Sequence, residues 1–137
     1  MLLSNKKEVN KKMSMSKLMT QPVMRIYEDS TIQEAVEIMG KESFGTLLVT
    51  RDGKDVGIIT AGDIISKVVA KKKDLETIKV KEIMSSPLVT ADKKTTGENA
   101  LRMMVKNDVR RLLITDNEEI IGIFTTSDIT KLVPQDE

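Results

Sequence analysis

An internal repeat is the strongest constraint on how this chain folds. Residues 57–63 read Gly-Ile-Ile-Thr-Ala-Gly-Asp, and residues 122–128 read Gly-Ile-Phe-Thr-Thr-Ser-Asp, 65 positions later. The same offset aligns residues 18–68 with residues 83–133 without a gap, and it pairs Met19 with Met84 and Pro22 with Pro87. A fixed period of this length indicates that one supersecondary unit was duplicated and that each copy needs its neighbour to bury an apolar face.

The composition limits the chemistry that the chain offers. Its 137 residues include no Cys and no His, which removes thiol nucleophiles, imidazole bases and the usual zinc ligands. We therefore expect no enzyme activity, no catalytic cofactor and no metal site. A net charge of +1 gives no reason to expect a polyanionic partner. No apolar run approaches the roughly twenty residues of a membrane span, and the N-terminus does not resemble a signal peptide, so we expect a cytoplasmic protein.

Residues 1–16 precede the repeat and form an N-terminal arm. Four lysines and few apolar side chains in this arm predict a mobile or partly helical, solvated segment. The alternative is an arm that docks on a partner subunit or on a nucleic acid.

The first repeat, residues 17–73, has the pattern β-α-β-β-α. Pro22 suits the beginning of a strand at about 23–27. Residues 30–33 read as a capping box for a helix that ends near Ser43, with an apolar stripe at Ile32, Ala35, Val36 and Met39. Strands at 45–50 and 56–59 flank the turn 51–54, and Asp63 starts a second helix with an apolar stripe at Ile64, Ile65, Val68 and Val69.

The second repeat, residues 80–133, follows a linker at 74–79 and has the same pattern. It predicts a strand from about 88 to 90, a capping box at 95–98, a helix containing Ala100, and strands at 110–115 and 120–124. Asp128 opens a short last helix, which Pro134 stops before a tail at 134–137. The predicted fold class is α+β.

A Thr and an Asp three residues apart recur at both strand-to-helix turns. A helix cap explains the two aspartates, because a carboxylate there accepts backbone N–H groups of the first turn. A nucleoside site is the functional alternative. A carboxylate takes both hydroxyls of a ribose, while the Thr hydroxyl and helix amides meet phosphate oxygens. Two copies in register favour the nucleoside interpretation.

These residues resemble a tandem pair of CBS domains, often called a Bateman module. The resemblance rests on residues 19–23 and 84–88, on the helices with Ala35 and Ala100, and on the two Gly-h-h-Thr-x-x-Asp turns, where h is apolar. It covers residues 17–133. It implies two repeats packed through their sheets with pseudo-twofold symmetry. It also implies two clefts for AMP, ADP, ATP or S-adenosylmethionine, and a regulatory role toward another protein.

Each cleft is implied to combine residues of both repeats. The first would use Asp128, Ser127, Thr125, Ile123, Arg111, Arg110, Ser30, Ala35, Val23 and Pro22. The second would use Asp63, Gly62, Thr60, Ile58, Thr46, Gly45, Thr95, Ala100, Leu88 and Pro87.

The two implied clefts differ at the positions that meet phosphate in the family. Arg110 and Arg111 fill these positions in the first cleft, and one of them is expected to point into it, because adjacent strand residues face opposite ways. The second cleft has Gly45 and Thr46 there, and Gly62 lacks the hydroxyl of Ser127. The second cleft is therefore empty, weak or suited to a nucleoside.

The resulting hypothesis is an adenine-nucleotide sensor that forms a homodimer through its apolar helical faces and regulates a separate protein. A binder of S-adenosylmethionine or another adenosyl compound, a nucleic-acid-binding accessory that uses the lysine-rich arm, and a dimer with vestigial clefts are the alternatives.

Overall fold

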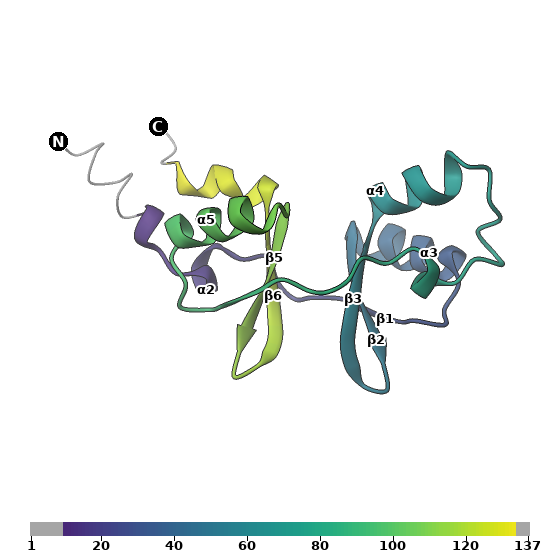
Figure 1. Cartoon of the computed structure of the whole chain (residues 1–137), viewed down its shortest axis with the longest axis horizontal. Coiled ribbons are helices and arrows are strands. Elements are labelled where there is room, and N and C mark those ends of the chain that lie inside the picture. The colour runs from purple at the N-terminus through teal and green to yellow at the C-terminus, as the bar shows by residue number, and fades with distance from the viewer. Residues whose placement is uncertain (1–9, 134–137) are drawn as a thin grey trace. The chain divides into compact units, whose positions relative to one another are not determined.

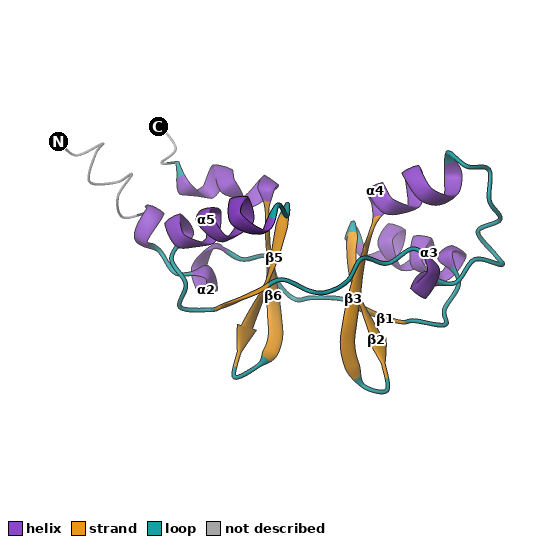
Figure 2. Cartoon of the chain, in the orientation of Figure 1, coloured by secondary structure: helices purple, strands orange, loops and turns teal. Residues whose placement is uncertain are grey.

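The computed structural model describes residues 10–133 as two compact units, each built on a three-stranded sheet. The continuous unit consists of residues 24–88, and the split unit combines residues up to 23 with residues from 89 onward. Within each unit the helices lie on one face of the sheet (Figures 1 and 2). This mixed architecture confirms the predicted α+β class.

The continuous unit carries the elements of the first repeat. They are β1 (Arg25–Tyr27), α3 (Ile32–Glu42), β2 (Thr46–Arg51), β3 (Lys54–Thr60), α4 (Ala61–Ile64), the π-helical η1 (Ile65–Val69) and the 3-10 helix η2 (Val80–Glu82). Strand β1 runs parallel to β2, which pairs antiparallel with β3. Asp52 and Gly53 both have positive φ in the β2–β3 turn, the conformation that an Asp-Gly hairpin favours.

The split unit repeats this topology with its own elements. They are α2 (Met15–Leu18), β4 (Thr90–Asp92), α5 (Gly97–Asn107), β5 (Arg111–Asp116), β6 (Glu119–Thr125) and the 3-10 helix η3 (Thr126–Leu132). Both hairpins shift register at equivalent positions, Val49/Thr50 and Ile114/Thr115. The duplication seen in the sequence is therefore also a duplication of structure, which includes the irregularity in each hairpin.

The helix boundaries correct several predictions by one or two residues. The side chains of Thr31 and Thr96 cap α3 and α5, one residue later than predicted. The two motif aspartates lie in the first turns of α4 and η3, which begin two residues earlier than predicted, at Ala61 and Thr126. Pro134 and the tail lie outside the described residues.

The predicted apolar stripes separate into buried and exposed members. Ile32, Ala35, Ile64 and Val68 belong to the core of the continuous unit. Val36, Ile65 and Val69 are 39%, 62% and 54% exposed, so these three predicted stripe residues do not belong to the core.

The short strands β1 and β4 begin later than predicted, at Arg25 and Thr90, and β4 extends to Asp92. The residues that precede these strands pair with other strands, β6 and β3. Thr20 exchanges two backbone hydrogen bonds with Ile123 of β6, but Pro22 has no amide hydrogen with which to continue the pairing. Pro87 ends the equivalent pairing between Ser85 and Ile58 of β3.

These bonds define two leading segments, residues 19–23 and 84–88. Each belongs to the unit formed mainly by the other repeat, because residues 19–23 pair with β6 and residues 84–88 pair with β3. The methionine of each leading segment lies directly on a strand glycine. A Cβ on Gly122 would lie 2.4 Å from the sulfur of Met19, and a Cβ on Gly57 would lie 2.6 Å from that of Met84.

The N-terminal arm is part of the split unit from at least residue 13. Met15 is completely buried in the core beside Phe124, Met13 packs against that core, and the amide of Met15 bonds the carbonyl of Thr95 at 2.8 Å. The prediction of a solvated segment is therefore wrong for Met13 and Met15. Residues 1–9 lie outside the described range.

Within residues 10–133 no helix has both the length and the apolar character needed to cross a membrane.

Replacing Met15 by Ala tests whether the N-terminal segment is structural. Its burial predicts a loss of about 2–5 kcal/mol in the free energy of unfolding, measured by urea denaturation, because the substitution leaves a cavity in the core. Lys12→Ala, at an exposed neighbouring position, is the control and should leave the unfolding midpoint unchanged. Equal midpoints for Met15→Ala and the wild type would contradict this role.

Replacing Gly122 by Ala tests the contact between a leading segment and its strand. The added methyl overlaps Met19, so we expect a loss of about 1–3 kcal/mol of stability. In a Met19→Ala background the same substitution should cost much less, and the double-mutant cycle measures this coupling. Gly40→Ala, where a Cβ meets no atom within 4 Å inside α3, should be neutral or stabilising. Additive losses for Gly122 and Met19 would refute the contact.

Candidate functional site

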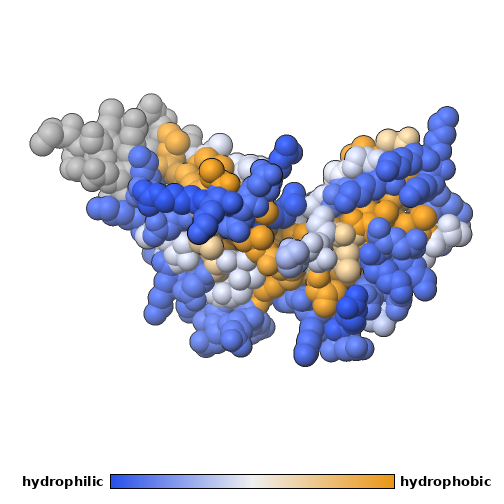
Figure 3. Space-filling model, in the orientation of Figure 1, coloured by the Kyte–Doolittle hydropathy of each residue, from blue (hydrophilic) through white to orange (hydrophobic). Residues whose placement is uncertain are grey.

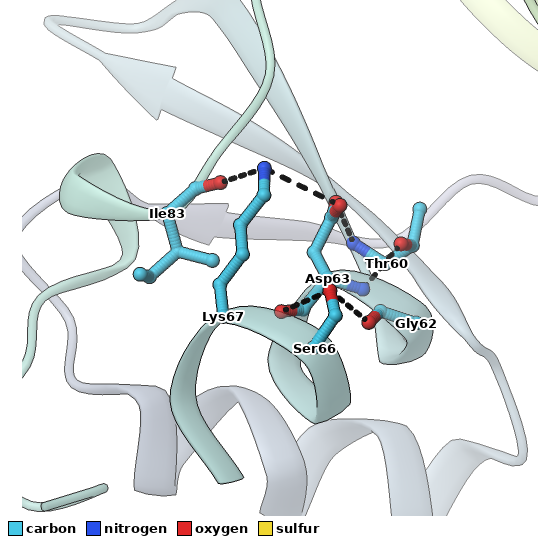
Figure 4. A network of polar contacts seen from close by, with 6 residues as sticks. All are labelled: Thr60, Gly62, Asp63, Ser66, Lys67 and Ile83. Carbon is cyan, nitrogen blue, oxygen red and sulfur yellow. Dashed lines mark hydrogen bonds and ion pairs between the residues drawn. The ribbon is translucent and has the colours of Figure 1, made fainter. Parts of the chain in front are cut away.

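The turn between β3 and α4 presents the first motif aspartate (Figure 4). The amide of Thr60 donates to Oδ2 of Asp63 at 3.1 Å, and the amide of Asp63 donates to Oγ1 of Thr60 at 3.1 Å, which is a reciprocal capping box. The ammonium of Lys67 lies 3.5 Å from Oδ1 of Asp63, whose side chain is 20% exposed. Asp63 is thus both a capping residue and a partly accessible acceptor.

The turn between β6 and η3 presents the second motif aspartate in a more enclosed setting. Asp128 is 6% exposed. Its Oδ2 accepts the amide of Thr125 at 2.9 Å, with the Thr125 hydroxyl at 3.4 Å. Its Oδ1 accepts the hydroxyl of Thr20 at 3.2 Å and pairs with the ammonium of Lys131 at 2.9 Å. A leading segment therefore contributes directly to the surroundings of this carboxylate.

Every invariant position of the Gly-h-h-Thr-x-x-Asp turn has a structural role. The glycine admits a methionine, the threonine begins the helix, and the aspartate accepts the backbone amide of that threonine. Fixed spacing of these residues follows from folding alone. The motif thus positions two carboxylates but does not by itself demonstrate a ligand.

Arginines lie at the start of the paired strand beside only one of the two turns. Arg111, the first residue of β5, pairs with Thr125 of β6, and directly paired residues of antiparallel strands point to the same face. Arg110 is exposed, and its carbonyl accepts the amide of Thr126 at 3.0 Å. Neither arginine has an ion-pair partner within residues 10–133. In the continuous unit Thr46 pairs with Thr60, and Gly45 accepts the amide of Ala61 at 2.9 Å.

The remaining predicted site residues fall into two groups. Pro22, Val23, Ser127 and Ile123 share the split unit with Asp128, and Gly62, Ile58, Pro87 and Leu88 share the continuous unit with Asp63. Both Ser127 and Gly62 are exposed. Two predicted residues of each cleft belong to the other unit, Ser30 and Ala35 for the first cleft and Thr95 and Ala100 for the second. Ser30 and Thr95 precede the helix caps, while Ala35 and Ala100 are completely buried in the cores of their own units. Their contribution to a ligand site stays a prediction.

Sequence reasoning missed three polar neighbours of the aspartates: Thr20, Lys67 and Lys131. The two lysines could have been found, because they follow the aspartates at spacings of four and three residues, where helical side chains meet. Thr20 is 108 positions from Asp128 and gave no local signal. Within the described part of the chain, no group of three or more acidic side chains is placed to hold a metal ion.

Comparisons with known proteins identify the fold family. The model of the CBS domain matches residues 15–70 and 80–135. The CBS domain-containing protein YhcV of Bacillus subtilis is 32% identical over 116 residues, which are 85% of this chain and 82% of that protein. An uncharacterized protein of Methanopyrus kandleri is 33% identical over 110 residues, which are 77% of this chain but only 56% of its own length.

Solved structures agree with the family match. An uncharacterized conserved protein from Pyrococcus horikoshii superposes with a TM-score of 0.81 at 30% identity, covering 93% of this chain and 96% of that one. A hexameric CBS-CP12 protein from bloom-forming cyanobacteria gives a TM-score of 0.79 at 31% identity, covering 85% of this chain and 66% of its own. The chain therefore belongs to the CBS-domain family and carries two CBS domains in tandem.

Proposed function

We propose that this protein is a regulatory module that binds an adenine nucleotide (AMP, ADP or ATP) mainly at the Asp128 turn and signals to a separate protein. CBS domains are commonly regulatory modules that bind adenosine compounds. The observation that carries the proposal is the position of Arg111, which faces the same side of the sheet as Thr125 and has no ion-pair partner within residues 10–133.

The two turns differ in the groups that they offer to the phosphates of a nucleotide. Both aspartates offer oxygen acceptors that suit the hydroxyls of a ribose. Within residues 10–133, the split unit adds at its turn the guanidinium of Arg111, which has no ion-pair partner there, and Ser127 supplies a hydroxyl where the continuous unit has Gly62. Charge-assisted hydrogen bonds to phosphate are roughly twice as strong as neutral ones. The Asp63 turn, beside Gly45 and Thr46, then binds phosphates weakly and suits a nucleoside at most.

The same reasoning ranks the alternative ligands. S-adenosylmethionine carries no phosphate, so it makes no use of Arg111, and we rank it behind the nucleotides. The sequence contains neither His nor Cys to act as a base or nucleophile, so the proposed role is regulatory. The regulated protein and the cytoplasmic location stay predictions.

We further propose that a second copy of the chain covers the apolar grooves between the helices. A groove of about 530 Å³ lies between α3 and α4 of the continuous unit, lined by Val36, Met39, Phe44, Ile64, Ile65 and Val69. Figure 3 shows apolar surface in the region of α3 and α4. A smaller groove of about 310 Å³ occupies the equivalent place in the split unit, lined by Leu101, Met104, Val105, Val109, Thr126 and Ile129.

The repetition of the groove supports this choice of partner. A partner that covers both grooves must present two similar apolar surfaces, and a second copy has such a pair. A closed twofold dimer lets the same surfaces meet from both sides.

Isothermal titration with AMP, ATP and adenosine tests the ligand proposal. Asp128→Asn should weaken nucleotide binding about ten- to a hundredfold, because an acceptor for the bound ribose is lost. Asp63→Asn should leave most of the nucleotide binding intact. Arg111→Ala should weaken AMP and ATP while sparing adenosine.

Arg102→Ala is the matched control for charge. Arg102 lies on α5 of the same unit and pairs with Glu98 at 2.7 Å, so its removal should leave every affinity unchanged. Thermal unfolding of each variant checks the fold. Loss of binding in Asp63→Asn with retention in Asp128→Asn would show that the principal site has been placed in the wrong unit.

Light scattering at micromolar concentration tests the dimer. The wild type should have about twice the chain mass of 15.3 kDa, and Ile65→Glu should shift it toward the monomer because it places a charge in the larger groove. Val133→Glu changes an equally apolar side chain, 56% exposed outside both grooves, and should remain dimeric. A monomeric wild type would exclude the proposed dimer.

A further inference from the structure

One lysine in each unit joins the motif aspartate to the main chain of a distant segment. In the split unit the ammonium of Lys131 lies 2.9 Å from Oδ1 of Asp128 and donates to the carbonyl of Leu18 at 3.0 Å. In the continuous unit the ammonium of Lys67 lies 3.5 Å from Oδ1 of Asp63 and donates to the carbonyl of Ile83 at 3.3 Å (Figure 4). Each carbonyl directly precedes a leading segment.

The two lysines do not occupy equivalent sequence positions, and the type of helix accounts for the difference. Leu18 and Ile83 are related by the repeat offset of 65, but Lys67 and Lys131 differ by 64. The reason is helix pitch. Lys131 follows Asp128 by three residues in a 3-10 helix, whereas Lys67 follows Asp63 by four residues in wider α and π turns. Both units thus form the same bridge from different sequence positions.

At Asp128 this bridge completes the coordination of the carboxylate. Two donors reach Oδ1 and two reach Oδ2, and an ionised carboxylate has about four lone-pair positions. A ribose needs some of these positions. The Thr125 amide is fixed at the start of η3, so a side-chain donor must leave. Lys131 is 44% exposed and can extend into water, while the Asp128 side chain is only 8% exposed.

We infer that Lys131 determines ligand specificity at the Asp128 turn by occupying the acceptor position that a ribose hydroxyl requires. This inference rests on the proposed function. When a ribose binds, its hydroxyl displaces the ammonium, and the carbonyl of Leu18 loses its side-chain donor in the same step. Binding is thereby coupled to the N-terminal segment that includes α2 and the buried Met15. Lys67 forms a longer and weaker version of the bridge.

Adenosine is the informative probe, because it carries the ribose hydroxyls without phosphates. Removing a cation weakens phosphate binding whatever its cause, but this effect is absent for adenosine. Lys131→Met keeps most of the aliphatic stem and removes the ammonium. We expect it to bind adenosine about fivefold tighter than the wild type, with no gain for 2′,3′-dideoxyadenosine, which lacks both hydroxyls. Lys67→Met should give a smaller gain.

Lys93→Met is the matched control. Lys93 belongs to the same unit, is 37% exposed and pairs with Asp116 at 3.1 Å, away from the motif aspartate. Its removal should leave adenosine affinity unchanged. Lys131→Gln is a second neutral variant, in case Lys131→Met unfolds, and unfolding midpoints verify the fold of each.

The outcomes separate the two proposals. Adenosine binding that is unchanged or weaker in both Lys131 variants, with a wild type that binds adenosine or AMP, overturns the role of Lys131 alone. An equal gain for 2′,3′-dideoxyadenosine also overturns it, because the competition would then not involve the hydroxyls. If neither the wild type nor any variant binds adenosine, AMP or ATP, the proposed function fails and the inference fails with it.

Discussion

The attachment of each leading segment to a strand of the other repeat is the interaction on which this structure depends. Three contacts make it in both units: a methionine against a strand glycine, a two-way backbone pair, and a lysine bond to the preceding carbonyl. Because of it, the split unit draws its core from both ends of the described chain, with Met15 beside Phe124. The split unit cannot be cut from the sequence as one piece, and each unit includes a segment from the other repeat.

This attachment explains why the turn motif is a poor indicator of function on its own. Asp63 and Asp128 would be retained in a CBS repeat that binds nothing, because they accept the amides that begin α4 and η3. A ligand at either turn would bind a carboxylate that already accepts a backbone amide in the fold. Substitutions at the aspartates therefore affect stability and binding together, and a substitution at Arg111, which has no ion-pair partner within residues 10–133, is a cleaner probe of binding.

The sequence predicted the features that depend on local periodicity and on the repeat. The order β-α-β-β-α, the two hairpins and the C-terminal end of α3 near Ser43 follow from patterns within a few residues. Apart from shifted boundaries and exposed stripe residues, its failures involve contacts that are distant in sequence. The burial of Met15 and the bond from Thr20 to Asp128 depend on where the N-terminal segment lies in the split unit, and a lysine-rich composition suggested a solvated arm instead.

Comparison of the two units separates the residues that folding requires from those it leaves free. Where folding requires an interaction, the units keep it even when the residues change. Glu28 and Arg51 join the ends of β1 and β2 at 2.8 Å, and Lys93 and Asp116 make the equivalent pair with reversed charges at 3.1 Å. The hydrogen bond from Arg51 lowers the pKa of Glu28, which is the expected direction for a paired carboxylate.

The two units differ in sequence at positions where the fold requires no particular side chain. Arg111 and Thr46 occupy equivalent positions in the two sheets, as do Ser127 and Gly62 in the following turns, although the strand partners of the first pair, Thr125 and Thr60, are the same residue type. The fold tolerates either residue at these positions, so stability does not account for the arginine or the serine. A difference beside otherwise equivalent aspartates is what two sites with different ligand preferences would produce, and it supports the proposal that the split unit binds the phosphates.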